Sequence, residues 1–262
     1  MQYATIQFEI RGVGAWITLN RPKEMNSITV NMLDELETAL TECQADSNVR
    51  AVVLTGSGAA FCAGVDLKGA LASIEGAPPG AKDFLDRCND VFGLLRTFPK
   101  PVIAALNGVT LAGGLELAMC CDLIMAAESA KIGDAHSNYG VFPGAGGAAV
   151  LPRKVGLNRA KYLLFSGDLL PAAELEKYGL VNRVTPDAEL VGEVEKLIEK
   201  LATKSPLVLR RMKEVANASL DQTQEAALRH EMLTLRQHCR SYDLHEGLNA
   251  FAEKRKPEFK GY

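Results

Sequence analysis

Two glycine-rich turns mark the places where this chain could perform chemistry. The first spans Phe61 to Lys68 (FCAGVDLK) and the second spans Ala112 to Cys121 (AGGLELAMCC), and each follows an apolar run that predicts a buried strand. Glycine lets a ligand approach the backbone, and the free amides of a following helical turn point outward as donors. If the strands are neighbours, the turns could direct two amides at one carbonyl oxygen and form an oxyanion hole. The alternative is that the glycines only permit tight crossings between strand and helix.

A single carboxylate, Glu116, lies in the otherwise apolar run from Leu111 to Met119. Burying a carboxylate is costly unless the group is paired or functional, so Glu116 is a candidate general acid or base beside the second turn. The structural alternative is a carboxylate that caps the same helix.

Several familiar catalytic motifs are missing from the sequence. Residues 56–61 (GSGAAF) begin like a dinucleotide-binding fingerprint, but Phe61 stands where the third glycine should permit close packing of the helix. The sequence has no P-loop and no GxSxG nucleophile elbow, and His230-Glu231 lacks the second histidine of an HExxH zinc helix. We therefore expect neither a hydrolase triad nor a metal site.

The composition is that of an ordinary globular chain. Its 262 residues include 29 Lys and Arg against 32 Asp and Glu, which gives a net charge of −3, and 47% are hydrophobic. This length fits one large domain, and so small a charge lacks the attraction for phosphates that dominates nucleic-acid binding. The apolar stretch from Pro101 to Met125 is uncharged only as far as Leu115, short of the roughly 20 residues that cross a bilayer. Residues 1–5 show no signal-peptide pattern, so we expect a cytoplasmic protein with no membrane or nucleic-acid partner.

The cysteines are too few to suggest a disulfide framework. There are six, and none is spaced as CxxC. Cys43 and Cys88 fall at apolar positions of helical patterns, and Cys120 and Cys121 lie inside an apolar run. We expect these four to be buried thiols.

The elements that must position the two turns follow from hydrophobic periodicity. Alternating apolar residues over 3–20 predict a β-hairpin that turns at residues 12–14. Apolar residues at helical spacing predict a helix that is capped by Asn26 or Ser27 and reaches Cys43. Residues 51–55 predict a short buried strand.

The same kinds of element return later in the chain. Residues 69–81, rich in Gly, Ala and Pro, predict a loop, and a second amphipathic helix is expected from Phe84 to Leu95. Residues 101–106 predict another buried strand, and an apolar helix is expected to start near Leu115. Strand, glycine-rich turn and helix thus occur twice, which is typical of an α/β architecture. From about Asn158 the pattern is mostly helical, and Ser205-Pro206 predicts a helix start.

At these motifs the sequence resembles the crotonase family, the enoyl-CoA hydratase/isomerase superfamily, over nearly the whole chain. The matching segments are Asn20–Lys23 with Asn26, FCAGVDLK, PVIAALNG with AGGLELAMCCD, GVFPGAGG at 140–147, and AFAEKRKPEF at 250–259. The resemblance implies an α/β spiral of ββα units over residues 1–200. It also implies a C-terminal helical region over residues 201–262 that forms homotrimers, often paired into hexamers.

The resemblance also implies an acyl-CoA thioester as substrate and no separate cofactor, because CoA is part of the substrate. The amides of Val65 and Gly113 would hold the thioester oxygen and stabilise an enolate. The residues implied to lie along CoA are Lys23, Ala63, Val65, Asp66, Leu67, Lys68, Gly113, Phe251 and Lys254. The last two, in the tail, would complete the site from the same or a neighbouring subunit. Without the family context, Lys254 to Lys256 would be a solvated helix face.

One position departs from the family pattern. Hydratases of this family typically carry two glutamates, and Glu116 matches the first, but His136 occupies the position of the second. Histidine transfers protons near neutral pH, so Glu116 could deprotonate a water while His136, as imidazolium, protonates the α-carbon. Neutral histidine could instead orient water or abstract a proton. The alternative is a loop histidine that packs beside Tyr139 and shapes the pocket.

We therefore expect an enoyl-CoA hydratase, which adds water reversibly to a trans-2-enoyl-CoA. Because fold alone does not establish a reaction, two alternatives stay open. One is a crotonase-type hydrolase of carbon–carbon bonds, or a decarboxylase, that acts on an acyl-CoA through His136 and Tyr139. The other is a non-catalytic acyl-CoA-binding protein. The resemblance disfavours double-bond isomerisation, because isomerases of the family commonly rely on an acid at the position of His136. Asp134 lies close enough in sequence to substitute, but two residues along a loop need not point the same way.

Overall fold

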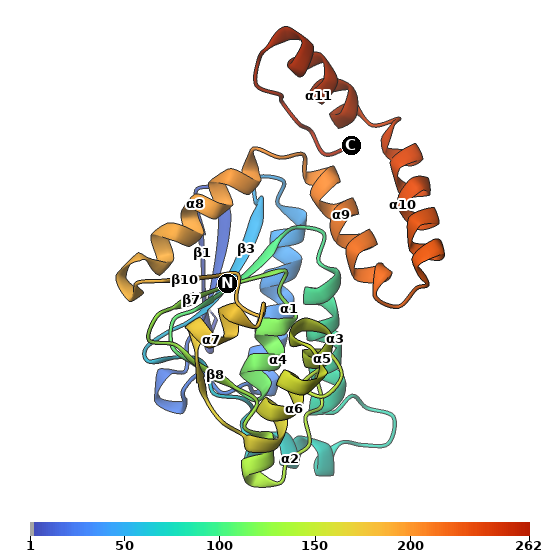
Figure 1. Cartoon of the computed structure of the whole chain (residues 1–262). Coiled ribbons are helices and arrows are strands. Elements are labelled where there is room, and N and C mark those ends of the chain that lie inside the picture. Colours follow the sequence, from blue (N-terminus) through green and yellow to red (C-terminus); the bar gives the residue numbers. More distant parts are fainter. Residues whose placement is uncertain (1–2) are drawn as a thin grey trace.

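The computed structural model describes residues 3–262 and shows an α/β fold with two sheets (Figure 1). Met1 and Gln2, which belong to the start considered above for a signal peptide, lie outside the described residues. The larger sheet has six strands in the order β1 (Ile6–Arg11), β2 (Gly14–Leu19), β3 (Ala51–Gly56), β5 (Val102–Leu106), β7 (Leu123–Ala127) and β10 (Arg183–Thr185). The smaller has four in the order β4 (Ala60–Cys62), β6 (Val109–Leu111), β8 (Lys131–Gly133) and β9 (Leu170–Pro171). The predicted α/β class is confirmed.

The two sheets are built together along the chain. The predicted hairpin is confirmed, since β1 pairs antiparallel with β2, and from β2 onward every pair in the larger sheet is parallel. After each of β3, β5 and β7 the chain passes directly into β4, β6 or β8 of the smaller sheet. This alternation repeats the same unit three times and places β4, β6 and β8 side by side.

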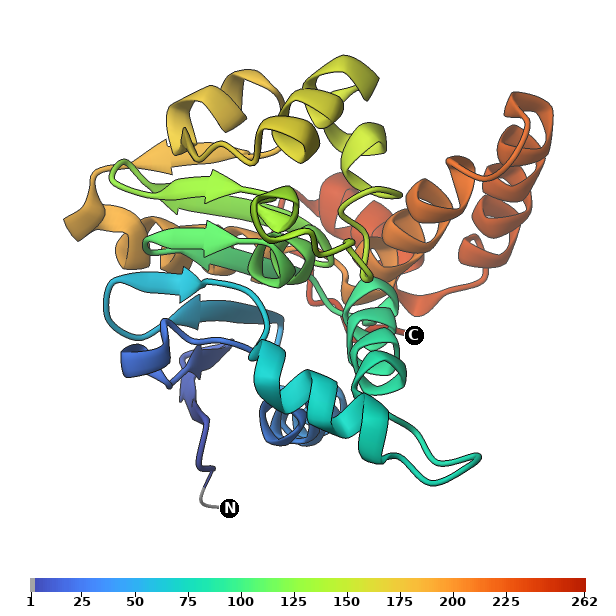
Figure 2. The ribbon, with the colours of Figure 1, turned by 90° about the horizontal axis from the view of Figure 1, so that it is seen from below.

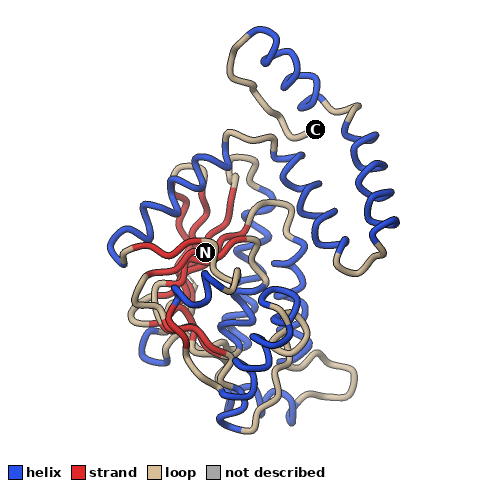
Figure 3. The backbone as a smooth tube through the Cα atoms, viewed as in Figure 1, coloured by secondary structure: helices blue, strands red, loops and turns tan. Residues whose placement is uncertain are grey.

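Helices α1 and α3 cover one face of the larger sheet and α8 covers the other. The helices are α1 Val30–Ala45, α2 Leu67–Gly76, α3 Phe84–Thr97, α4 Gly113–Met119, α5 Leu151–Val155, α6 Leu157–Ser166, α7 Ala172–Lys177, α8 Leu190–Ala202, α9 Pro206–Ser219, α10 Gln224–His238 and α11 Tyr242–Glu253, with short 3₁₀ turns η1 Pro22–Glu24, η2 His136–Tyr139 and η3 Asp187–Glu189. Successive side chains of a strand point to opposite faces. Val52 and Leu54 of β3 therefore join the core beneath α1 and α3, whereas Ala51 and Val53 pack with α8. Figure 3 shows the strands lying between these helices.

The predicted loop over residues 69–81 is wrong in its first half. Residues Leu67–Gly76 form α2, and the side chain of Asp66 caps this helix by accepting a hydrogen bond from the amide of Gly69. The small residues suggested a flexible loop, but Leu67, Leu71 and Ile74 recur at helical spacing. Figure 2 shows α2 beside α3, joined to it by a projecting loop.

The predicted cap of the first helix is also wrong. The helix α1 begins after Thr29, whose hydroxyl accepts a hydrogen bond from the amide of Met32. Asn26 instead has a left-handed backbone, and its side chain fastens the preceding loop to the carbonyls of Ser57 and Ala60. The predicted strands over 51–55 and 101–106 and the helix from Phe84 are confirmed.

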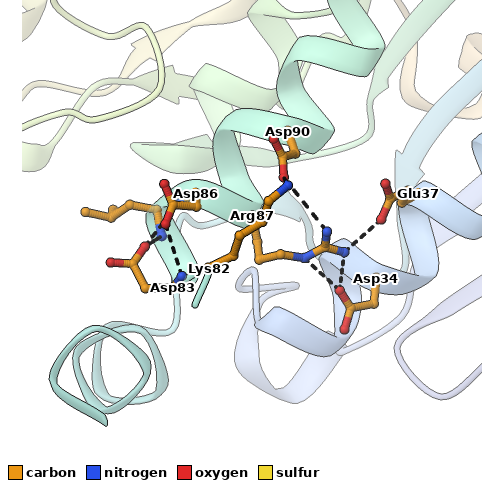
Figure 4. Close-up of polar contacts among 8 residues, drawn as sticks. Asp34, Glu37, Lys82, Asp83, Asp86, Arg87 and Asp90 are labelled. Atoms are coloured by element: carbon orange, nitrogen blue, oxygen red, sulfur yellow. Dashed lines mark hydrogen bonds and ion pairs between the residues drawn. The ribbon is translucent and has the colours of Figure 1, made fainter. Parts of the chain in front are cut away.

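Charged side chains fix the start of α3 against α1 (Figure 4). Arg87 of α3 reaches Asp34 and Glu37 of α1, with 2.8 Å to Glu37, and Lys82 pairs with Asp90 at 2.5 Å. Asp83 caps α3 and forms a capping box with Asp86 at the third position, which the figure also shows. These contacts matter because the first turns of α3 form one wall of the pocket described below.

The C-terminal helices α9, α10 and α11 project away from the sheets (Figure 1). The predicted helix start at Ser205-Pro206 is confirmed, since the Ser205 hydroxyl accepts from the amide of Val208. The apolar helix expected near Leu115 begins two residues earlier, at Gly113. The cysteines predicted to be buried are buried. No helix within residues 3–262 is long and apolar enough to span a membrane.

Candidate active site

The two glycine-rich turns meet because their strands are neighbours. Strand β4 pairs in parallel with β6, with Ala60 opposite Val109, so both turns leave the same edge of the smaller sheet. Gly113, just after β6, lies against the first turn. A Cβ on Gly113 would be only 2.9 Å from Cγ2 of Val65. Glycine at position 113 therefore permits the close approach of the two turns.

Among residues 3–262, the amides of Val65 and Gly113 are both left without an acceptor. Val65 forms a parallel bridge with Ile28, but this bridge uses the carbonyl of Gly64 and the amide of Asp66, not the amide of Val65. Gly113 is the first residue of α4, where an amide has no acceptor within the helix. Two unused donors from adjacent turns are what an oxyanion hole requires.

Ala112 sets the direction of the Gly113 amide. Its φ of 47° and ψ of −119° lie in a region that favours glycine, so this alanine is strained. Its own amide donates to Gly133 and its carbonyl accepts from Glu116, which holds the strained conformation in place. These two hydrogen bonds fix the residue before α4 to β8 on one side and to the first turn of α4 on the other.

Glu116 lies in α4 with its side chain almost fully buried. Its Oε1 accepts two backbone hydrogen bonds of 2.8 Å, one from Ala145 and one from Gly147. The alternative that it caps its own helix is wrong, since no side chain caps α4. Because Oε1 is occupied by the loop, Oε2 is the oxygen available to a ligand.

His136, at the start of η2, brings its ring to the same place. Its Nε2 lies 4.0 Å from Glu116 Oε2, and its Nδ1 lies 2.9 Å from Asp134 Oδ1. Both His136 and Asp134 are buried, and Asp134 Oδ2 has no hydrogen-bond partner in the described part of the chain. Asp134 does not replace the missing acid; it contacts the far side of the imidazole. The sequence offered only their spacing of two residues as a signal for this pair.

The surroundings of His136 favour its protonated form. Burial lowers the pKa of the imidazole, but the hydrogen bond and negative charge of Asp134 act in the opposite direction. The charge of Glu116 adds to this effect, and the net result is a pKa raised above the ordinary value of 6.5.

A mostly apolar cavity of about 480 Å³ opens in front of Glu116 and His136. It is bounded by the two glycine-rich turns, by α2, by the start of α3 and by η2 with the loop that follows. Its apolar side chains are Leu67, Leu71, Ile74, Phe84, Leu85, Leu111, Val141 and Phe142, and Cys88 and Tyr139 also line it. The cavity can therefore hold an apolar chain next to Glu116 Oε2, His136 Nε2 and the amides of Val65 and Gly113.

Besides Val65 and Gly113, the residues expected along CoA lie in different surroundings. Ala63 and Leu67 line the cavity. Asp66 caps α2 and lies 3.5 Å from Arg21, which joins the turn carrying Lys23 to the start of α2. Lys23 and Lys68 are exposed near this junction, where they are free to meet phosphate groups.

Phe251 and Lys254 are not brought to the cavity within one chain. Phe251 belongs to α11 and is exposed, and Lys254 ends that helix in a left-handed conformation. Figure 1 shows α11 and α2 at opposite ends of the molecule. Within residues 3–262, no three His, Cys, Asp or Glu side chains are grouped as ligands for a metal ion.

Known proteins match this chain over nearly its whole length. A family model described as enoyl-CoA hydratase/isomerase matches residues 10–262. The chain is 38% identical over 262 residues to a crotonyl-CoA hydratase of Syntrophomonas wolfei, with 99% of each chain covered. It is 38% identical over 256 residues to a probable mitochondrial enoyl-CoA hydratase of Dictyostelium discoideum, covering 98% of this chain and 91% of that one. A crystal structure of enoyl-CoA hydratase from Bacillus anthracis matches with a TM-score of 0.90 and 35% identity, covering 99% of this chain and 100% of that one.

Proposed function

This chain belongs to the enoyl-CoA hydratase/isomerase family, and we propose that it catalyses the reversible addition of water to a trans-2-enoyl-CoA. The observation that carries the proposal is the pair of free atoms, Glu116 Oε2 and His136 Nε2, which face each other across 4.0 Å beside two unused amides. An acid–base pair next to an oxyanion hole is the machinery that hydration of a conjugated thioester needs.

In this mechanism the thioester oxygen accepts hydrogen bonds from the amides of Val65 and Gly113. A water held between Glu116 Oε2 and His136 Nε2, at about 2.8 Å from each, fits their separation. Glu116 takes a proton from this water while the oxygen of the water attacks the β-carbon. Negative charge then moves to the thioester oxygen, where the two fixed amides stabilise the enolate.

The second half of the reaction completes the addition. His136 in its protonated form delivers the Nε2 proton to the α-carbon, and the enolate returns to a thioester. Glu116 then holds one proton more than at the start and His136 one fewer. Transfer of that proton from Glu116 to His136 restores the site, so the net change is one water added. The reaction consumes no cofactor, because the CoA group belongs to the substrate.

The proposal is tested by incubating the protein with 2-enoyl-CoA thioesters of short, medium and long chain. Loss of the conjugated enoyl-thioester absorbance, with a product heavier by one water in mass spectrometry, is the expected result. Products of carbon–carbon cleavage or decarboxylation would instead support the alternative use of His136 and Tyr139. Tight binding with no turnover at high enzyme concentration would support a non-catalytic acyl-CoA-binding protein.

We propose further that the chain works as a homotrimer or a hexamer, with Phe251 and Lys254 of a neighbouring subunit completing the CoA site. Support comes from a groove of about 660 Å³ between α9 and α10, whose apolar residues Met212, Leu228, Met232 and Leu235 are all at least half exposed. Exposed apolar surface of this kind is typical of an interface between proteins. Light scattering should give a trimeric or hexameric mass, and a monomer at micromolar concentration would contradict the proposal. A cytoplasmic location remains a prediction from the sequence.

A further inference from the structure

We propose that Asp134 is a positioning residue of this active site, which fixes the ring of His136 with Nε2 toward Glu116 and holds it in the protonated form that donates a proton. This inference rests on the proposed hydration. It assigns a role to a side chain that does not face the cavity and that would act only through His136.

The backbone between the two residues is shaped for this contact. Ala135 has a left-handed φ of 57°, which is strained for alanine and turns the chain back within a single residue. As a result, Asp134 Oδ1 accepts from Nδ1 of His136 at 2.9 Å and also lies 3.4 Å from the backbone amide of the same residue. One oxygen therefore holds both the ring and the peptide that carries it.

This contact determines which ring nitrogen faces the reaction. An ionised carboxylate only accepts hydrogen bonds, so Nδ1 must carry a hydrogen, and Nε2 is left toward Glu116. The ring cannot turn over without losing its bond to Asp134. After Nε2 has given up its proton, the bond to Asp134 keeps the remaining hydrogen on Nδ1.

The burial of Asp134 favours a charged histidine beside it. Only about 1% of Asp134 is exposed, and its Oδ2 has no hydrogen-bond partner in the described chain. A buried carboxylate with one bare oxygen needs a nearby cation, and the imidazolium of His136 is the group that contacts it. The raised pKa of His136 agrees with this pairing.

The other titratable groups near the ring do not oppose the protonated form of His136. Glu116 of α4 is the second charged group that acts on the ring, and it too favours the imidazolium. Cys88 of α3 lines the same cavity, and burial raises the pKa of its thiol to about 12, so it is neutral. Tyr139 lies on the same 3₁₀ turn, and the neighbouring helix α6 is joined to this turn through Asn138, a neutral side chain that donates to the carbonyl of Gly167 just beyond α6.

The first test measures the ring directly and needs no turnover. Histidine-selective ¹⁵N labelling should show His136 with both nitrogens protonated at pH 6.5, and His136→Gln assigns its signal among the four histidines. In Asp134→Asn, whose amide oxygen can still accept from Nδ1, the His136 pKa should fall by about one unit or more. A neutral ring at pH 6.5 in the unaltered protein would overturn the inference, even if Asp134→Asn failed to fold.

A matched control separates this effect from the loss of any buried carboxylate. Asp243 of α11 is buried to the same extent, with about 1% exposed, but lies outside the cavity. Asp243→Asn is expected to leave the pKa of His136 unchanged. An equal shift in both variants would mean that Asp134 acts only through the general stability of the fold.

The second test uses turnover of a 2-enoyl-CoA. Because the donor form is the protonated one, activity should fall as pH rises through the His136 pKa, and Asp134→Asn should move this fall to lower pH. The same substitution should lower kcat about 10- to 1,000-fold with little change in KM. In a His136→Glu background, Asp134→Asn should not lower kcat, since Asp134 would there be a like charge beside the new acid.

The outcomes distinguish the inference from the proposed function. A protein with a charged His136 that depends on Asp134 but turns over no enoyl-CoA would refute the hydration and keep the pairing. A protein that hydrates enoyl-CoA with equal losses from Asp134→Asn in both backgrounds would keep the hydration and refute the positioning role.

Discussion

Gly147 and Glu116 are joined by a 2.8 Å hydrogen bond from the glycine amide to Oε1 of the carboxylate. No larger residue fits at position 147. A Cβ there would lie 2.6 Å from Asp134 Oδ2, 2.7 Å from Cβ of Pro143 and 3.4 Å from Glu116 Oε1. Gly147 thus lets its loop bind Glu116, the candidate base, and pack against Asp134, the partner of His136.

Gly147→Ala should therefore damage both sides of the site. We expect the clash to push the loop away from Asp134, lowering kcat by about tenfold or more and the free energy of unfolding by about 1–3 kcal/mol. Gly144→Ala is the control for stability in the same loop, because a Cβ there meets nothing within 4 Å. Gly144 also lines the cavity, so only its unfolding is compared. Enoyl-CoA turnover and urea unfolding measure the two effects of Gly147→Ala, and an equal loss of stability in Gly144→Ala would contradict this account.

Glu116→Gln should separate chemistry from binding. The amide oxygen of glutamine can still accept from Ala145 and Gly147, so the fold and the cavity should survive, but the side chain can no longer take a proton from water. We expect kcat to fall about 10²- to 10⁴-fold. Calorimetry with a saturated acyl-CoA should show nearly unchanged affinity. Glu128→Gln, at an exposed position after β7, serves as the control, and retention of full activity in Glu116→Gln would exclude a base role.

Ala112→Gly should stabilise the protein. Glycine adopts the backbone conformation of Ala112 without strain, and relief of about 1–3 kcal/mol should exceed the added entropy of the unfolded chain, about 0.5–1 kcal/mol. Ala226→Gly, in the ordinary helical backbone of α10, should change stability in the opposite direction. Chemical denaturation of both variants tests this, and destabilisation by both would show that position 112 is not strained.

The C-terminal tail should respond to acid through Glu246. A bidentate pair with Arg255, and then the amide of Glu258, lower the pKa of Glu246 from 4.5 to about 2. A depressed pKa means that the stabilisation is present above pH 4.5 and is lost as pH falls toward 2. The stability difference between the unaltered protein and Glu246→Gln should therefore shrink over that window.

Glu253→Gln is the control for this prediction. Glu253 contacts the same arginine at 2.6 Å, but it is exposed, and exposed ion pairs contribute little. Denaturation curves between pH 6 and pH 3 measure the difference for each variant. A difference for Glu246→Gln that stays constant with pH would show that the ion pair does not hold the tail.

The sequence by itself determined the class of the fold and the positions of its candidate chemistry. Hydrophobic periods predict β1, β2, β3, β5 and α3, because one face of each must be buried and the period of the backbone determines which residues share that face. The two glycine-rich turns, Glu116 and His136 were also visible, since each is a local departure from its surroundings. The resemblance then predicted which of these residues share one site.

The tertiary structure decided how those groups are oriented. Asp134 and His136 lie in an irregular segment, where no period predicts the direction of a side chain, and a left-handed Ala135 turns them toward each other. The loop that binds Glu116 Oε1 is distant in sequence, so only the packing of the chain brings its amides to the carboxylate. The same packing keeps α11 away from the cavity of its own chain, although its residues match the family's CoA-binding tail. Side-chain direction and contacts between distant segments depend on the whole fold, because they are set where elements meet and not along any one of them.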